Sequence, residues 1–153
     1  MTTFTIPTLK TDRLTLRPYH VDDFATYFTL MSGNRAQYMG GPYTQSQAWD
    51  WFTNDTVTWQ FFGYGTLAIE TEDGALAGFV GLINPPSFPE PECGWGLYEG
   101  FTGRGFATEA ARAILDHTFA TTDLKTIVSY VDRENIASQN VAKRLGGVLD
   151  TDA

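Results

Sequence analysis

The sequence is poor in the residues that build disulfides, metal sites and basic surfaces. It contains 1 cysteine and 2 histidines, and its 10 Lys and Arg residues are outnumbered by 18 Asp and Glu residues. A single cysteine, Cys93, excludes a disulfide within the chain and a cysteine-rich zinc site. Such cysteine usage is typical of a reducing compartment, so we expect a cytoplasmic protein. The histidines, His20 and His117, are distant from each other and predict no metal site.

Charge and hydropathy exclude two further classes of protein. A formal net charge of −8 is a poor basis for binding nucleic acid, which requires a basic face. The same negative field raises the local concentration of ammonium groups and mildly favours a cationic substrate. No apolar run approaches the roughly 18 residues that cross a bilayer. Residues 1–10 also lack the basic start and apolar stretch of a secretory signal. We therefore expect neither nucleic acid nor a membrane as partner.

The sequence does contain ample apolar material for one domain over residues 1–153. Hydrophobic residues make up 42% and aromatic residues 14% of its 153 residues, a composition typical of one packed core. Alternation over residues 13–17 predicts a half-buried strand. Helical spacing predicts a first helix after Asp22 and Asp23, and a second over residues 46–57 with Asp50 and Asp55 facing outward.

The second half of the chain predicts more strands and two more helices. Alternating or apolar segments predict strands at 66–71, 76–84, 92–98 and 126–131, the first two joined as a hairpin. Gly94 and Gly96 indicate a bulge or a close backbone approach in their strand. The third helix follows Gly105, and its inward stripe is Ala107, Ala110, Ala111, Ile114, Leu115 and Phe119. The last helix spans 135–145, with Ala137, Val141 and Leu145 inward.

The start of the third helix is the segment most informative about function. The first N–H groups of a helix have no intrahelical partner, and the macrodipole adds positive charge there. Glycines let this backbone approach a phosphate closely. The run Gly103-Arg104-Gly105-Phe106-Ala107-Thr108 therefore predicts a diphosphate cradle, although a glycine pair alone is also typical of an ordinary tight turn. The loop lacks the Gly-Lys-Ser/Thr ending of nucleoside-triphosphate sites and the spacing of the dinucleotide fingerprint.

Three separated motifs resemble those of GNAT-superfamily N-acetyltransferases. Residues 103–108 are similar to the acetyl-CoA loop of that family. Residues 132–138 and 142–146 are similar to its last-helix motif. Residues 11–17 resemble the opening of the RimJ/RimL-type branch, the ribosomal-protein-alanine N-acetyltransferase-like enzymes, which acetylate protein N-termini and small amines. The three motifs occur in the expected order and cover nearly the whole chain.

The resemblance implies an α+β fold with three αβα layers, a mixed central sheet and direct acetyl transfer from acetyl-CoA to a primary amine. The acceptor is a protein N-terminal α-amine or a small-molecule amine, and no metal takes part. The alternative is a non-catalytic acyl-CoA-binding or sensing domain of the same fold. Relatives continue into a further hairpin of strands, whereas this sequence ends at Ala153, so we expect that hairpin to be missing or truncated. An unpaired strand edge there favours a homodimer.

The resemblance also implies which residues contact acetyl-CoA. The pantetheine arm lies along Trp95, Gly96 and Leu97, and the diphosphate on the N–H groups of Gly103, Arg104, Gly105, Phe106, Ala107 and Thr108. Asn135 bonds the pantetheine and Ser138 lies near the thioester sulfur. Lys143 and Arg144 reach the nucleotide phosphate, or are solvated cations near a helix end.

Catalytic and acceptor residues follow from chemistry and from the same resemblance. An ammonium must lose its proton before it attacks a thioester, and Glu92 is the first candidate base, with Glu70 and Asp132 as alternatives. Ala142 stands where relatives place a tyrosine that protonates the thiolate, so this role passes to Ser138 or to water. Tyr38, Tyr43 and Trp49 are expected to shape the acceptor cleft. Cys93 is expected to be a buried core residue.

Overall fold

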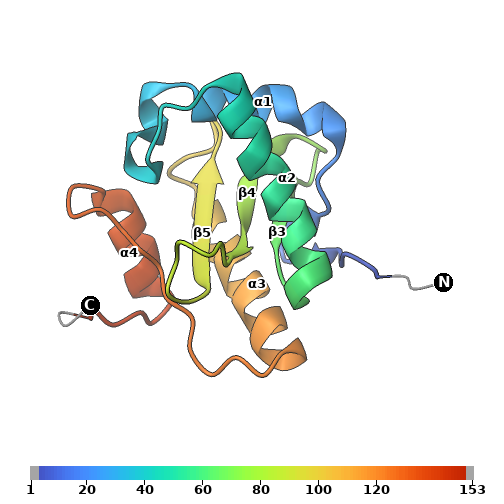
Figure 1. Cartoon of the computed structure of the whole chain (residues 1–153), viewed down its shortest axis with the longest axis vertical. Helices are drawn as coiled ribbons and strands as arrows, with labels where there is room; N and C mark the ends of the chain where they lie inside the picture. Colours follow the sequence, from blue (N-terminus) through green and yellow to red (C-terminus); the bar gives the residue numbers. More distant parts are fainter. Residues whose placement is uncertain (1–3, 151–153) are drawn as a thin grey trace.

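The computed structural model describes residues 4–150 and contains one antiparallel sheet covered by helices on both faces (Figure 1). The strand order is β1-β2-β3-β4-β5, formed by Leu9–Lys10, Leu14–Arg17, Thr66–Thr71, Leu76–Ile83 and Glu92–Leu97. Helices α1 (Phe24–Met31) and α2 (Gln45–Phe62) cover one face, and α3 (Phe106–Thr121) covers the other. Helix α4 (Ile136–Arg144) lies beyond β5. Short 3-10 helices occupy Val21–Asp23 and Asn34–Met39.

Two hydrophobic clusters form because side chains alternate between the faces of the sheet. On β4, Val80 and Leu82 pack with Ile114 of α3 in one cluster, whereas Phe79 packs with Tyr27 of α1 in the other. Strand β5 is paired with β4 so that Gly96 lies opposite Phe79 and Gly94 opposite Gly81. Gly94 and Gly96 therefore belong to the face covered by α1 and α2.

Helix α3 packs closely on the sheet because small residues form its inner face. Ala107 is 6% exposed, and Ala110, Ala111 and Ile114 are fully buried. Phe119, predicted to face inward, is 42% exposed, because the buried stripe continues from Ile114 to Thr118, which is fully buried, and the next residue is turned away from it. Glu109, on the first turn of this helix, bonds to Arg13 and Thr11 at the start of the chain.

Helix α2 is longer than predicted and places Asp55 inward. Its inner face repeats at helical spacing through Ala48, Phe52, Asp55 and Trp59, all at most 5% exposed. The expectation that Asp55 faces outward is therefore wrong, whereas Asp50 is exposed as predicted.

Two predictions about the end of the chain need correction. Residues 126–131 form a single isolated parallel bridge, Val128 to Glu92, instead of a strand. The five strands of the sheet pair antiparallel. Ala137, predicted to face inward, is exposed, while Val141 is buried. Within residues 145–150 no strand follows α4. None of the helices in the described part of the chain is long and apolar enough to span a bilayer.

Candidate active site

The loop before α3 takes a conformation that requires glycine. Gly103 and Gly105 both have φ of +78°, a left-handed conformation in which an L side chain is strained. Gly105 is also the N-cap of α3, and no side chain caps the first N–H groups of this helix. The open helix N-terminus predicted from residues 103–108 is therefore present, and it offers unpaired N–H groups to an anion.

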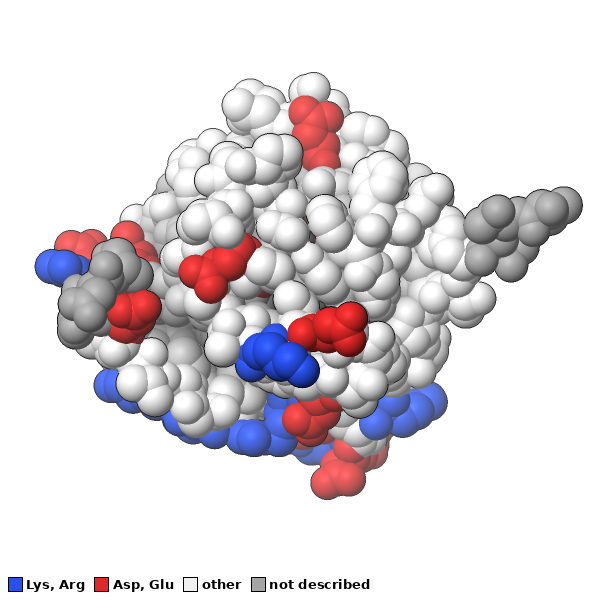
Figure 2. All heavy atoms as spheres, turned by 60° about the horizontal axis from the view of Figure 1, so that its bottom comes forward, with Lys and Arg blue, Asp and Glu red and all other residues white. Residues whose placement is uncertain are grey.

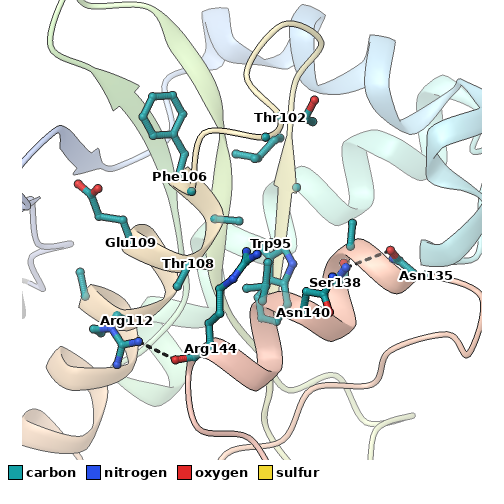
Figure 3. Close-up of a pocket in the computed structure, with 18 of the residues that line it drawn as sticks. Trp95, Thr102, Phe106, Thr108, Glu109, Arg112, Asn135, Ser138, Asn140 and Arg144 are labelled. Carbon is teal, nitrogen blue, oxygen red and sulfur yellow. Dashed lines mark hydrogen bonds between the residues drawn. The ribbon is translucent and has the colours of Figure 1, made fainter.

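A cavity of about 1190 Å³ lies in front of this helix N-terminus, between α3 and α4; we call it the donor cavity (Figure 3). Four of the 10 basic residues of the chain line it: Arg13, Arg35, Arg112 and Arg144. Asp12, Glu109 and Asp116 also line it, so its lining has a small excess of positive charge although the chain is acidic. Figure 2 shows Lys and Arg side chains gathered along one edge of the molecule. Arg112 donates a 2.8 Å hydrogen bond to the carbonyl oxygen of Arg144, which connects the two helices.

Two polar side chains of this cavity are informative. The Oγ1 atom of Thr108 is buried and has no hydrogen-bond partner. The side chain of Asn135 caps α4 by accepting a 3.2 Å bond from the N–H of Ser138 (Figure 3). A buried hydroxyl without a partner carries a free-energy penalty, which a bound ligand would relieve.

The exposed edge of β5 forms one wall of the donor cavity. The carbonyl of Leu97 accepts a bond from Arg35, and the N–H of Cys93 donates to Val128, both away from β4. In an antiparallel ladder every second residue points both backbone groups to the same side. The N–H and C=O of Trp95 therefore also point outward to the cavity, where an extended amide chain can pair with them.

Most of the residues predicted to contact acetyl-CoA line the donor cavity. They are Trp95, Gly96, Leu97, Gly103, Gly105, Phe106, Ala107, Thr108, Asn135 and Ser138. Arg104 does not: it donates to the carbonyl of Gly100 and lies over the rings of Phe101 and Phe106. Lys143 is exposed and also lies outside the lining, whereas Arg144, which was predicted together with it, lines the cavity. Prediction from sequence missed Thr11, Asp12, Arg13 and Arg35, which come from distant segments.

A second cavity of about 280 Å³ adjoins the first; we call it the acceptor cavity. Both are lined by Tyr38, Met39, Trp95, Asn135 and Ser138, so they meet at this common wall. Thr66, Gly81 and Gly94 form its floor, and they lie side by side across β3, β4 and β5. A Cβ atom added at Gly94 would meet no atom within 4 Å, so the absence of a side chain there keeps the cavity open.

The acceptor cavity is acidic and aromatic. Its lining includes Asp55, Glu92 and Asp132 and, among the described residues, no Lys, Arg or His. Burial raises the pKa of Glu92, and the 2.7 Å hydrogen bond from the Tyr130 N–H lowers it in part. Glu92, the predicted base, and Asp132, its alternative, both line the acceptor cavity. Glu70 lines neither cavity, because it forms an ion pair with Arg17.

Asp55 was not predicted as a site residue. It is 5% exposed, and it accepts a 2.8 Å hydrogen bond from the hydroxyl of Tyr19. Burial raises the pKa of Asp55 to about 7, although the Tyr19 bond opposes the shift. Its position was readable from the sequence, because residue 55 falls between Phe52 and Trp59 on one helical stripe.

The three residues predicted to shape the acceptor cleft have different locations. Tyr38 lines both cavities and Tyr43 lines the acceptor cavity. Trp49 lines neither: it is 42% exposed and packs edge-on against Phe24. Cys93 is buried as predicted, and burial raises the pKa of its thiol to about 12, so it is a core residue.

Together the open helix N-terminus and the two adjoining cavities form a site with room for a large anionic ligand and for a second, smaller ligand beside it. Comparison with known proteins agrees: the family model of the acetyltransferase (GNAT) domain matches residues 13–148. The chain belongs to the GNAT acetyltransferase family and has its fold, an α+β sheet flanked by helices. In the described residues, no group of three or more His, Cys, Asp or Glu side chains is placed to hold a metal ion.

Relatives of known structure or sequence share this fold over most of the chain. An acetyltransferase from Agrobacterium tumefaciens str. C58 is 47% identical, with a TM-score of 0.94 over 100% of this chain and 90% of that one. The uncharacterized protein YkkB of Bacillus subtilis (strain 168) is 31% identical over 148 residues, 90% of this chain and 83% of YkkB. RimL, a ribosomal L7/L12 α-N-protein acetyltransferase in complex with coenzyme A, is 20% identical, with a TM-score of 0.74 over 91% of this chain and 82% of RimL.

Proposed function

We propose that this acyltransferase moves the acetyl group of acetyl-CoA directly to a primary amine. The observation that carries the proposal is the contact between two cavities with different linings. Four arginines, three carboxyl groups and an open helix N-terminus line the donor cavity, whereas the charged side chains that line the acceptor cavity are all carboxyl groups. The common wall at Trp95 and Ser138 is where donor and acceptor would meet. The neighbouring fold of RimL, which holds coenzyme A, supports this choice of donor.

The residues of the donor cavity fit acetyl-CoA. The N–H groups at the start of α3 would bind its diphosphate, with Arg112 and Arg144 adding charge. The outward backbone groups of Trp95 would pair with the pantetheine amides as an added strand does. The bound donor supplies a thioester, whose carbonyl carbon accepts the amine. A backbone N–H of residues 95–97 would hold the carbonyl oxygen while negative charge develops there.

The residues of the acceptor cavity would take protons from the acceptor amine and supply one to the leaving thiolate. Glu92 would take a proton from the acceptor ammonium, which must be neutral to attack. A new C–N bond then forms as the C–S bond breaks, and the thiolate leaves. The nitrogen must lose a second proton to become an amide, and Ser138, or water, would accept that proton as it gives one to the thiolate, since Ala142 supplies no acidic hydrogen. No covalent bond to the protein forms, and Cys93 takes no part.

One substitution tests the donor cavity directly. Thr108→Val keeps the shape of the side chain but removes the hydroxyl that is buried without a partner. We expect the free energy of unfolding of the free protein to rise by about 1 kcal/mol, because an unpaired buried polar group is removed. The affinity for coenzyme A should fall by about tenfold if this hydroxyl bonds the ligand. Calorimetric titration with coenzyme A and urea unfolding measure the two effects, and a variant that binds coenzyme A with undiminished affinity contradicts this role.

The alternative, a non-catalytic acyl-CoA-binding or sensing domain, is favoured by Ala142 at the tyrosine position. A thiol-release assay with acetyl-CoA and a panel of primary amines distinguishes the two. Release of coenzyme A that depends on an amine supports the enzyme. Saturable binding of acetyl-CoA without turnover on any amine supports the sensing domain, and an absence of binding overturns both. A cytoplasmic location, the RimJ/RimL-type branch and a homodimer stay predictions.

A further inference from the structure

The acceptor cavity is lined by different elements on its two sides, and Asp55 lines it without lining the donor cavity. Helix α2, which carries Asp55, packs over β3 and β4, whereas α4, which carries Ser138, lies beyond β5 (Figure 1). Between them, Thr66 pairs with Gly81 and Gly81 with Gly94 across three strands. Neighbouring strands are about 4.8 Å apart, so this floor is about 10 Å long. Asp55 therefore lies at the end of the cavity that is far from the donor.

The titratable groups next to Asp55 are neutral tyrosines. Tyr19 donates to its carboxylate, and Tyr27 of α1 and Tyr98 after β5 are its other titratable neighbours. Burial raises the pKa of each of these tyrosines, so all three are uncharged near neutral pH. Thr66 and Gly81 of the facing strands carry no charge. Nothing in the lining of this cavity therefore neutralises an ionised Asp55.

A buried carboxyl group in this position disfavours folding. Its raised pKa of about 7 means that ionisation is more costly in the folded protein than in the unfolded chain. An Asn or an apolar residue would fill the same space without that cost. The carboxylate is balanced if a bound ligand brings a positive charge to it, and the aromatic rings of Tyr27 and Phe79 beside the cavity also favour a cation.

We propose that Asp55 determines acceptor specificity by binding a second cationic group of the acceptor, about 10 Å from the nitrogen that is acetylated. The inference rests on the proposed function, because it needs the acetylated nitrogen to lie at the wall shared with the donor cavity. The acceptor class is an elongated primary amine with a second ammonium or guanidinium group at its far end. A plain alkylamine of the same length leaves Asp55 without a counter-charge, and so does a protein N-terminus whose second residue is apolar.

The test compares straight-chain α,ω-diamines, from 1,3-diaminopropane to 1,8-diaminooctane, with n-alkylamines of matching length. Thiol release gives kcat and KM for each amine with the wild type, Asp55→Asn and the control Asp50→Asn, which changes an exposed carboxylate of the same helix outside both cavities. We expect kcat/KM of the best diamine to exceed that of its matched alkylamine by about tenfold or more, a difference typical of a charge-assisted contact. This ratio should fall toward 1 in Asp55→Asn, mainly through KM, and stay high in Asp50→Asn.

A binding measurement supplies a readout that does not depend on turnover. Calorimetric titration of the best diamine into protein saturated with coenzyme A should show tighter binding as the pH rises through about 7, because Asp55 then ionises. Asp55→Asn should lose this pH dependence and Asp50→Asn should keep it. Circular dichroism verifies that each variant is folded.

The outcomes separate this inference from the proposed function. Turnover of alkylamines without a preference for diamines overturns the role of Asp55 and leaves the acetyltransferase intact. A diamine preference that survives in Asp55→Asn also overturns the role of Asp55 and leaves the acetyltransferase intact. Preferred turnover of peptides with an apolar second residue has the same consequence. Binding of coenzyme A without turnover of any amine overturns the proposed function, and the inference with it.

Discussion

Replacing Gly94 with phenylalanine is expected to lower the rate of acetyl transfer by about a hundredfold or more, because the acceptor is no longer positioned. Gly94 lies on the floor of the acceptor cavity, and a Cβ atom built there meets no atom within 4 Å. Its φ angle is not in the left-handed region, so a side chain is tolerated by the backbone. The new ring would occupy the space that the acceptor needs. Gly94 is absent from the lining of the donor cavity, so binding of coenzyme A should persist.

Thiol release with a saturating amine measures the predicted loss of turnover, and calorimetry with coenzyme A measures the predicted persistence of coenzyme A binding. Gly94→Ala is the matched control, because a methyl group leaves most of the cavity open and should reduce turnover far less. Gly96 provides a contrast: an added Cβ would lie 2.5 Å from the ring of Phe79, so Gly96→Ala should destabilise the fold. Wild-type turnover in Gly94→Phe would show that the acceptor binds elsewhere.

Replacing Arg17 with methionine is expected to lower the free energy of unfolding by about 3 kcal/mol, the typical effect of removing one partner of a buried ion pair. Arg17 makes bonds of 2.9 and 3.0 Å to the two carboxylate oxygens of Asp23, and one of 2.7 Å to Glu70. The side chains of Arg17 and Asp23 are 25% and 11% exposed, so water replaces the lost guanidinium only in part. Urea unfolding at neutral pH measures the change.

The effect should depend on pH with a definite sign. Burial favours the neutral form of Asp23, but the bonds from Arg17 and from the backbone N–H of His20 together outweigh it and lower the pKa of this carboxyl group below its usual value. A group with a lowered folded pKa stabilises the fold above its unfolded pKa, about 3.9. That stability is lost as the pH falls through the folded pKa. The difference between the wild type and Arg17→Met should therefore be largest near neutrality and shrink in acid.

Arg13→Met serves as the control for this measurement. Arg13 also forms an ion pair, with Glu109 at 2.7 Å, but its side chain is 45% exposed. Exposed pairs contribute less than about 1 kcal/mol, so the loss should be much smaller than for Arg17→Met. Equal losses in the two variants would contradict the view that burial makes the Arg17 pair important.

Local patterns were sufficient for the elements whose signals are local. Alternation and the turn at 72–74 predicted β3 and β4 within one residue, and the glycine run predicted the start of α3. Residues 126–131 were predicted wrongly because a β-branched, apolar run favours a strand only if a partner is available. In the structure, Val128 is the one residue of this run that forms a β-bridge, and its partner is Glu92.

Charge location was the part of the site that local patterns predicted least well. Asp55 was expected outside because aspartate is seldom buried, although its helical position lies on the inner stripe. Arg13 and Glu109 are 96 residues apart, so no local pattern indicates their ion pair. A helix presents several side chains within reach of each charge, and only the packing of β2 beside α3 selects among them.

The amino-acid sequence by itself determined the acetyltransferase family, the sheet hairpin and the glycine cradle, because each depends on residues that are close together in the chain. Backbone conformation and helix termini are set by such neighbours. Only the tertiary structure decided that arginines from four segments meet at one cavity, that three small residues on different strands form the floor of another, and that Asp55 closes its end. Those features arise from pairing and packing between distant segments, which depend on strand register and helix orientation and not on local preference.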